Sequence, residues 1–171
     1  MSDATPRRVL VVCTGNICRS PMGEAFLRSH LAQRGLAHVA VSSAGTHAQV
    51  GRAVLPAVIQ ASASIGDGSS DSALLEHLAR QVDIVLARES DLILCAATEH
   101  RVHLLSWWPE LGAERVRLFN EAIAGQAPVD VDDPYGWDRD VFELAARVID
   151  RAMAAWAERI ARQWPLEGAG A

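Results

Sequence analysis

The sequence RRVLVVCTGNICRSP, at residues 7–21, passes from a strand through a turn into the start of a helix. The apolar run at residues 9–12 is continuous, which is typical of a strand buried on both faces in a parallel sheet. Turn-forming residues follow it, and Pro21 stands at a favourable first helical position of a helix that we expect to end at Gly35. A second short strand at residues 38–41 completes a β-loop-α-β unit with parallel strands and a right-handed crossover.

Helices and strands alternate along the rest of the chain. Helical spacing predicts helices over residues 54–64, 74–81, 99–107 and 138–164, and further strands at 91–95 and 115–119, while 82–87 fits either type. Residues 66–71 and 120–136 are expected to form loops, the first of them mobile. The apolar stripe predicted for the last helix comprises Val141, Leu144, Ala145, Val148, Ala152, Ala155, Trp156 and Ile160. This alternation predicts an α/β fold, a small doubly wound sheet of about four parallel strands flanked by helices.

Size and composition favour one globular domain. The chain has 171 residues, of which 50% are hydrophobic, so we expect a single domain over 1–171 with flexible tails at 1–6 and 165–171. The formal net charge is -5 and the basic residues are scattered, which disfavours a nucleic-acid partner. No apolar run approaches the roughly 18 residues of a membrane span, and no signal peptide is recognisable. We therefore expect a cytoplasmic protein without membrane insertion, a monomer or weak dimer.

The cysteine count points away from disulfides. Cys13, Cys18 and Cys95 are an odd number in a chain without a recognisable export signal. Reduced and reactive thiols are the better interpretation.

The loop after the first strand has the composition of an anion-binding site. In such sheets ligands bind beyond the carboxyl ends of the strands, where a helix N-terminus presents unpaired N–H groups and a positive dipole. We expect Gly15 to adopt backbone angles that a side chain would forbid, so that consecutive amides form a nest. Arg19 adds a planar fork of donors that can bind two oxygens of one phosphoryl group. The predicted substrate-binding residues of this loop are Thr14, Gly15, Asn16, Ile17, Cys18 and Ser20.

Cys13 stands at the base of this loop. Because the same positive field stabilises an anion, we expect Cys13 to be a thiolate and a nucleophile. It can attack phosphorus while the amides and Arg19 stabilise the charge of the transition state. Ser20 can hydrogen-bond the sulfur, and Asp133, held by the rigid Pro134, is the expected general acid and later general base. The catalytic set Cys13, Arg19 and Asp133 requires no cofactor and no metal.

Less specific interpretations stand beside these. A cysteine at a strand end can be an inert buried residue, and Asp-Asp-Pro can be a plain turn. Cys18 is either a packing residue or a redox-protective thiol that traps an oxidised Cys13 as a disulfide. His100 and His103 are expected on a solvated helix face, because the pattern offers no third metal ligand. Three further residues are expected to pack: Trp107, Trp108 and Cys95.

The run VVCTGNICRSPM, at residues 11–22, resembles the signature loop of the low-molecular-weight protein tyrosine phosphatases. Further motifs occur in the family's order: SAGT at 43–46, HLARQ at 77–81, DLIL at 91–94 and DPY at 133–135. The resemblance extends over about residues 7–160.

The resemblance implies roles for individual residues. It implies a phosphocysteine intermediate on Cys13, phosphate binding by Arg19, general acid catalysis by Asp133, and Tyr135 as a wall beside the substrate ring. It also implies a polar network that supports the loop, made by Asn16, Ser20, Ser43 and His77. Asparagine suits position 16, because it tolerates left-handed backbone angles better than other side chains.

The stretch THAQVG, at residues 46–51, differs from the eukaryotic members of the family. It lacks the tryptophan that those members place on the other wall of the cleft. It is more similar to bacterial members that are paired with tyrosine autokinases of exopolysaccharide export. The resemblance thus implies phosphotyrosine proteins as partners, a cognate tyrosine kinase among them, and a role in exopolysaccharide regulation.

Two rival functions share the predicted loop. A thiol-coupled arsenate reductase has this fold and a similar Cys-x5-Arg loop, but its thioredoxin-linked type uses two further cysteines, and here only Cys95 lies outside the loop. A phosphopeptide-binding module would recognise phosphate without cleaving it, which the presence of both Cys13 and Asp133 disfavours. The sequence therefore predicts a metal-free protein tyrosine phosphatase.

Overall fold

A four-stranded parallel sheet forms the centre of the computed structural model, which describes residues 7–65 and 71–164. The strands are β1 (Arg8–Cys13), β2 (Ala40–Gly45), β3 (Leu92–Cys95) and β4 (Val116–Leu118), in the spatial order β2-β1-β3-β4. Cys13 lies opposite Gly45 of β2, and Val12 lies opposite Cys95 of β3. The carboxyl ends of three strands therefore meet at one edge, and the predicted fold class is confirmed.

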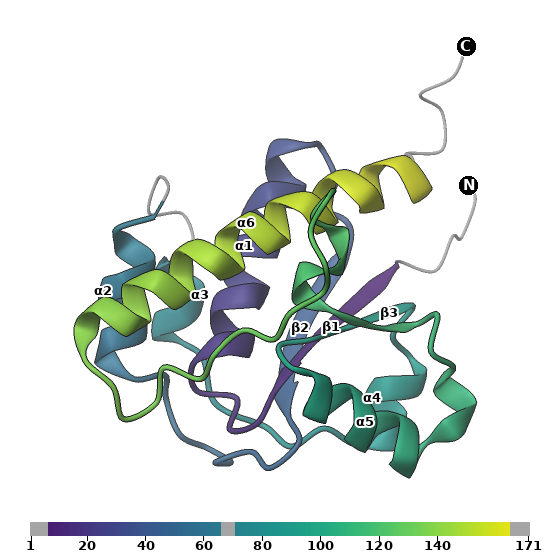
Figure 1. Cartoon of the computed structure of the whole chain (residues 1–171), viewed down its shortest axis with the longest axis horizontal. Coiled ribbons are helices and arrows are strands. Elements are labelled where there is room, and N and C mark those ends of the chain that lie inside the picture. Colours follow the sequence, from purple (N-terminus) through teal and green to yellow (C-terminus); the bar gives the residue numbers. More distant parts are fainter. Residues whose placement is uncertain (1–6, 66–70, 165–171) are drawn as a thin grey trace.

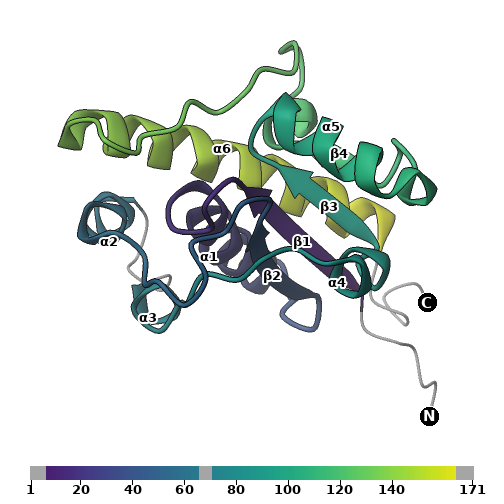
Figure 2. The ribbon, with the colours of Figure 1, turned by 90° about the horizontal axis from the view of Figure 1, so that it is seen from below.

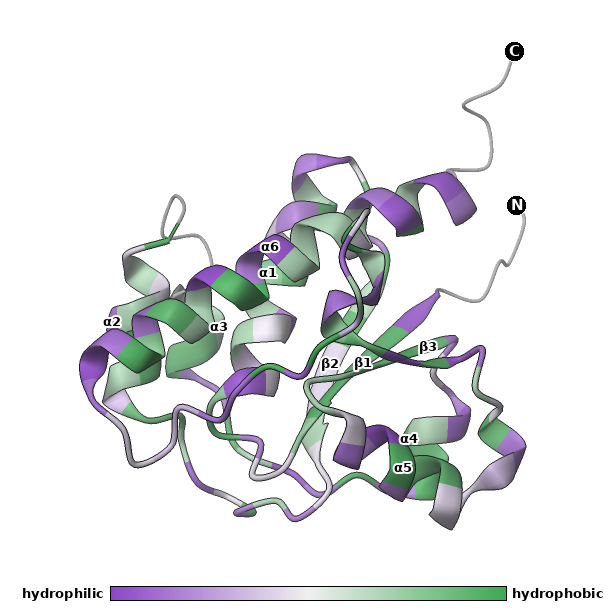
Figure 3. Cartoon of the chain, viewed as in Figure 1, coloured by the Kyte–Doolittle hydropathy of each residue, from purple (hydrophilic) through white to green (hydrophobic). Residues whose placement is uncertain are grey.

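Helices cover both faces of the sheet (Figure 1, Figure 2). One face carries α1 (Arg19–Gln33), α2 (Pro56–Ala63), α3 (Asp71–Leu75) and α6 (Arg139–Gln163). The other carries α4 (Ile84–Arg88) and α5 (Thr98–Trp107). Successive residues of β1 alternate between the two cores: Val9 and Val11 pack with the first group, Leu10 and Val12 with the second. Burial on both sides explains the continuous apolar run of β1 (Figure 3).

Short 3-10 turns complete the described elements. These are η1 (Pro109–Leu111) and η2 (Phe119–Ala122), which flank β4 along the chain. Among the described residues, no helix is long and apolar enough to cross a membrane. The tails expected at 1–6 and 165–171, and most of the loop expected at 66–71, lie outside the described residues.

The helix expected over residues 74–81 is largely wrong. Helix α3 ends at Leu75, and residues 77–80 belong to neither a helix nor a strand. The backbone of this segment is used elsewhere: the Ala79 N–H donates to Arg52 O at 2.8 Å, and Arg80 O accepts from the Gly45 N–H at 2.9 Å. These tertiary hydrogen bonds replace the helical ones that the local apolar spacing favours.

Two further boundaries differ from the expected ones. Strand β2 begins at Ala40 and continues to Gly45, which is four residues beyond the predicted end at 41. The ambiguous segment 82–87 resolves into α4, whose N-cap Asp83 accepts a hydrogen bond from the Leu86 N–H at 2.8 Å.

The buried stripe of the long helix α6 overlaps the predicted one in part: four of the eight predicted residues are buried, and Val148 and Ala155 are partly buried against the same core. Trp156 and Ile160 are buried as expected, but Leu144 is 57% exposed. Phe142 and Ile149 take the inward positions near the start of the helix. Apolar residues therefore occur on more than one side of α6, which is why spacing alone included Leu144 and omitted Phe142 and Ile149 (Figure 3).

Candidate active site

The loop between β1 and α1 turns its carbonyl groups outward. The carbonyl oxygens of residues 13–17 accept, in order, from Thr46 N–H (2.9 Å), His47 N–H (3.0 Å), Gln49 N–H (3.0 Å), His77 Nε2 (2.8 Å) and Leu55 N–H (3.4 Å). A trans peptide points its N–H away from its C=O, so the amides of residues 14–18 face the inside of the loop. Within the described part of the chain, no acceptor binds these amides. The loop is therefore a bowl of available donors at the start of α1.

Asn16 holds the bowl in shape. It is fully buried, and its φ of 55° is the only positive value at a non-glycine residue in the described segments. Its Nδ2 donates to Ser20 Oγ at 2.8 Å and to Ser43 Oγ at 3.0 Å, and its Oδ1 accepts from the Arg80 N–H at 2.9 Å. With the His77 bond to the Asn16 carbonyl, the strained residue is fixed from three segments.

Gly15 does not have the backbone role expected for it. Its φ is not positive, and a Cβ there would touch the Gln49 and Ile17 side chains at an ordinary 3.5 Å. Asn16 takes the left-handed position instead. The glycine that the loop requires is Gly45 on β2, where a Cβ would lie 2.4 Å from the Thr14 carbonyl oxygen.

Cys13 Sγ lies at the base of the bowl, 2.9 Å from Ser20 Oγ. Ser20 Oγ accepts from Asn16, and its own proton has two acceptors within reach, the sulfur and the more distant Ala44 O at 3.4 Å. A hydroxyl donor of this kind stabilises a sulfur anion. The sulfur is nearly buried, with Cys13 only 2% exposed, but it lines a cavity of about 160 Å³.

Arg19 reaches across the mouth of the bowl. Its guanidinium is buried and donates to Val131 O at 3.0 Å through Nη1 and to Asp133 Oδ2 at 2.8 Å through Nη2. Its Nε is buried and has no partner among the described residues. An unpaired buried donor is costly, and it fits a site that takes up an acceptor.

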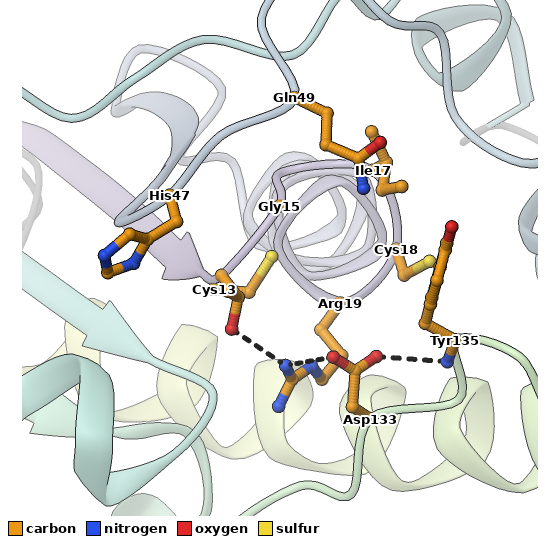
Figure 4. A pocket seen from close by; sticks show the side chains of 10 residues that line it. Cys13, Gly15, Ile17, Cys18, Arg19, His47, Gln49, Asp133 and Tyr135 are labelled. Carbon is orange, nitrogen blue, oxygen red and sulfur yellow. Dashed lines mark hydrogen bonds and ion pairs between the residues drawn. The ribbon is translucent and has the colours of Figure 1, made fainter.

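Asp133 and Tyr135 border the cavity on the side opposite His47 (Figure 4). The Asp133 side chain is 46% exposed, and its Oδ1 accepts from the Tyr135 N–H at 3.1 Å. Tyr135 is 52% exposed. The carboxyl group thus lines the same cavity as the Cys13 sulfur and has access to solvent, as a proton donor for a leaving group requires.

Cys18 also lines the cavity and is 4% exposed. Burial, reinforced by the neighbouring Cys13, raises its pKa to about 12, so it is a thiol at neutral pH. All three cysteines are free, and Cys95 is fully buried as expected, with a pKa raised by burial.

His100 lies behind the loop, and its expected place on a solvated helix face is wrong. It is fully buried; Nδ1 accepts from the Ala97 N–H at 3.0 Å, and Nε2 lies 2.9 Å from Thr14 Oγ1. Burial lowers its pKa to about 4, so the neutral ring carries its proton on Nε2 and donates to Thr14. Helical spacing could not reveal this, because it places both His100 and His103 at one side of α5.

Gln81, the last residue of the HLARQ motif, is a second supporting residue, for which the motif implied no role. Its Oε1 accepts from the Ala48 N–H at 2.9 Å and its Nε2 donates to Thr46 O at 2.7 Å. This clamp fixes the 46–49 segment, whose amides bind the outward carbonyls of the bowl.

Comparisons with known proteins agree with this geometry. Over residues 8–166 the chain matches the profile of a family described as low molecular weight phosphotyrosine protein phosphatase. Etp, a low molecular weight protein-tyrosine-phosphatase of Escherichia coli strain K12, is 34% identical over 90% of this chain and 95% of its own length. The crystal structure of the tyrosine phosphatase AmsI of Erwinia amylovora superposes with a TM-score of 0.77 and 31% identity, covering 93% of this chain and 96% of that one. A structure of YwlE arginine phosphatase gives a TM-score of 0.79 at 26% identity, with 92% and 97% covered. The chain belongs to the low molecular weight phosphotyrosine protein phosphatase family.

Proposed function

We propose that the protein is a cysteine-dependent protein tyrosine phosphatase that hydrolyses phosphotyrosine monoesters through a phosphocysteine intermediate. One observation carries the proposal. Five inward-facing amides and the unpaired Arg19 Nε surround the space above Cys13 Sγ, which is the donor set that a phosphoryl dianion requires.

In the first step the Cys13 thiolate attacks phosphorus in line with the leaving oxygen. The S–P bond forms and the P–O bond breaks, while the loop amides and Arg19 bind the equatorial oxygens. Protonated Asp133 gives its proton to the departing phenolate. Arg19 stabilises the resulting carboxylate; in the free protein Arg19 Nη2 lies 2.8 Å from Asp133 Oδ2.

In the second step water hydrolyses the phosphocysteine. The Asp133 carboxylate removes a proton from water, the water oxygen attacks phosphorus, and the P–S bond breaks. Ser20 stabilises the departing sulfur anion through its hydroxyl, 2.9 Å away. Inorganic phosphate leaves, and the enzyme returns to its starting state.

The walls of the cavity favour an aryl ester. The exposed Tyr135 ring borders the opening of the cavity, and Ile17 adds an apolar contact to its lining. An aromatic pair of this kind adds about 0.5–1.5 kcal/mol to burial alone. Gln49 stands at the position where a second wall would be, so one face of the substrate ring contacts an amide rather than a ring.

The proposed partners are phosphotyrosine proteins in the cytoplasm, with the protein acting as a monomer or weak dimer. The likeness to Etp and AmsI, both named tyrosine phosphatases of bacteria, supports a bacterial tyrosine kinase or its targets as substrate. The resemblance noted in the sequence points to kinases of exopolysaccharide regulation.

The experiment is hydrolysis of phosphotyrosine and p-nitrophenyl phosphate by the wild type, by Cys13→Ser and by Cys95→Ala as a matched control. We expect loss of activity in Cys13→Ser only, because Cys95 is buried on the far side of β3 from the cavity. Wild-type turnover by Cys13→Ser overturns the proposal.

The same proteins are also tested with two other substrates, phosphoarginine and arsenate, each of which corresponds to an alternative function of this fold. Phosphoarginine tests the likeness to YwlE arginine phosphatase, and arsenate-dependent thiol oxidation tests the reductase alternative. We expect phosphotyrosine to be the best of the three by kcat/KM. A clear preference for phosphoarginine or arsenate contradicts this assignment.

Cys18 is proposed as the protective thiol. If hydrogen peroxide oxidises Cys13 to a sulfenic acid, attack by the Cys18 sulfur forms a disulfide and releases water. Inactivation by peroxide should then be reversible by dithiothreitol in the wild type and irreversible in Cys18→Ser. Equal recovery of both proteins contradicts the role.

A further inference from the structure

Three aromatic rings form a surface beside the cavity, which we call the aromatic rim: His47, His103 and Trp107. The His103 and Trp107 rings stack with centroids 5.4 Å apart and planes 5° apart. His47 packs edge-on against both, at 5.5 Å from His103 and 6.1 Å from Trp107. The rim therefore joins the 46–49 segment to the side of α5.

The rim is continuous with the proposed active site. His47 lines the cavity above Cys13, on the side away from Tyr135 (Figure 4). His47 is exposed, and Trp107 is 41% exposed. A phosphotyrosine whose phosphate is bound in the bowl would therefore bring its neighbouring residues over the rim.

Glu99 adds a negative charge to the rim. It stands one helical turn before His103, and its Oε1 lies 3.5 Å from Thr14 Oγ1 at the cavity mouth. Its side chain is 62% exposed.

Among the described residues, no arginine forms an ion pair with Glu99; Arg19 Nη2 lies 3.4 Å from the same Thr14 oxygen but is paired with Asp133. His100 Nε2 lies 3.4 Å from Glu99 Oε1, but His100 is neutral at pH 7 because burial lowers its pKa to about 4. Arg52, another cation near the cavity, is hydrogen-bonded to Gln49 Oε1. Glu99 is thus available to a cation from outside.

We propose that the aromatic rim and Glu99 bind basic side chains on either side of the phosphotyrosine of a peptide substrate. The inference rests on the proposed function and adds a sequence preference to it. Glu99 and Trp107 stand eight residues apart on α5, about 12 Å along its axis, so they would bind two different side chains. One arginine or lysine would lie against the exposed part of Trp107 by a cation–π contact, and another would place its charge near the Glu99 carboxylate. Acidic neighbours of the phosphotyrosine would be repelled by Glu99.

The test uses three phosphotyrosine peptides that differ only in the residues on either side of the phosphotyrosine, which are arginine, alanine or glutamate. We expect the wild type to show kcat/KM about three- to tenfold higher for the arginine peptide than for the glutamate peptide. The preference should weaken as salt is added, because the Glu99 contact is exposed.

Substitutions at Trp107 and Glu99 test whether the preference for the arginine peptide arises from the aromatic rim and Glu99. Trp107→Leu and Glu99→Gln should each reduce the arginine-to-glutamate ratio, and Trp107→Phe, which keeps a ring, should retain most of it. Turnover of p-nitrophenyl phosphate, which has no neighbouring residues, should be unchanged in Trp107→Leu. Glu110→Gln controls for the loss of one negative charge elsewhere on the surface. Glu110 is exposed, and its Oε1 lies 2.6 Å from Arg88 Nη2.

The possible results separate the two proposals. A wild-type ratio of one or less overturns the rim as a basic-residue site, and so does a ratio that survives both Trp107→Leu and Glu99→Gln or that falls equally in Glu110→Gln. Failure to hydrolyse even p-nitrophenyl phosphate overturns the proposed function, and this inference with it.

Discussion

Arg19 and Asp133 are bound to each other in the free protein, 2.8 Å apart, although the proposed reaction gives them different tasks. Arg19 must also bind phosphate oxygens, for which its buried Nε is available. The pair therefore keeps the arginine in position before substrate arrives and stabilises the carboxylate after it has given up its proton.

Asp133→Asn tests this division of roles. The amide cannot supply a proton, so we expect kcat/KM for phosphotyrosine to fall by about 10²–10⁴. The loss should be smaller for p-nitrophenyl phosphate, whose leaving group is less basic. Inhibition by inorganic phosphate should be equal or stronger, because Arg19 loses an anionic competitor. Weaker phosphate binding together with equal losses for both substrates contradicts a general-acid role.

At the scale of elements, the end of β2 supports the bowl by close contact. A Cβ at Gly45 would lie 2.4 Å from the Thr14 carbonyl oxygen and 3.1 Å from atoms of Ala48. Both contacts are with segments that position loop amides. Gly45→Ala must therefore displace the loop from β2.

We expect Gly45→Ala to lower phosphate affinity and kcat/KM by at least tenfold while the protein remains folded. Far-ultraviolet circular dichroism and phosphate-dependent thermal shifts measure the two effects separately. A variant with normal phosphate affinity would show that the loop does not depend on this contact.

The start of α5 is linked to the bowl through His100, and this link depends on pH. Burial lowers the pKa of His100 from 6.5 to about 4, so the unfolded chain binds more protons between these values. The free energy of unfolding should fall as the pH drops from about 6.5 to about 4, by about 3 kcal/mol at most from this residue.

Denaturant titrations at pH 7 and pH 4.5 measure the effect, with His100→Gln as the variant that cannot titrate. The difference in stability between the two pH values should be smaller in His100→Gln than in the wild type. An equal difference in both proteins would show that His100 is not held neutral by the fold.

At the scale of the whole molecule, local sequence patterns predicted the structural features that are determined by residues close together in the chain. The continuous apolar run of β1 and the following loop predicted the parallel sheet and the phosphate bowl. Residues 77–81 could not be assigned this way, because their backbone and Gln81 bind segments 27 or more positions away. The same holds for His100 and Gly45, whose roles arise from contacts across the fold.

In helix α6 too, apolar spacing alone does not tell buried from exposed positions. Two substitutions test which positions are buried. Trp156 is buried, and its Nε1 donates to Phe119 O at 2.8 Å, which ties the helix to the end of β4. Trp156→Phe removes this bond and leaves a cavity, so we expect a loss of about 2–3 kcal/mol. Leu144→Ala, at an exposed position, should change stability by about 0.5 kcal/mol or less. Urea titrations compare the two, and similar losses would contradict the packing of α6.

The central claim is that Cys13 accepts the phosphoryl group inside the bowl of amides. Acid quenching during turnover of p-nitrophenyl phosphate, followed by mass spectrometry of the proteolysed protein, measures it directly. The account predicts one added phosphoryl group on Cys13, more abundant in Asp133→Asn if the loss of the base slows its hydrolysis, and none in Cys13→Ser. Turnover with a phosphoryl group on another residue, or activity that persists in Cys13→Ser, would contradict it.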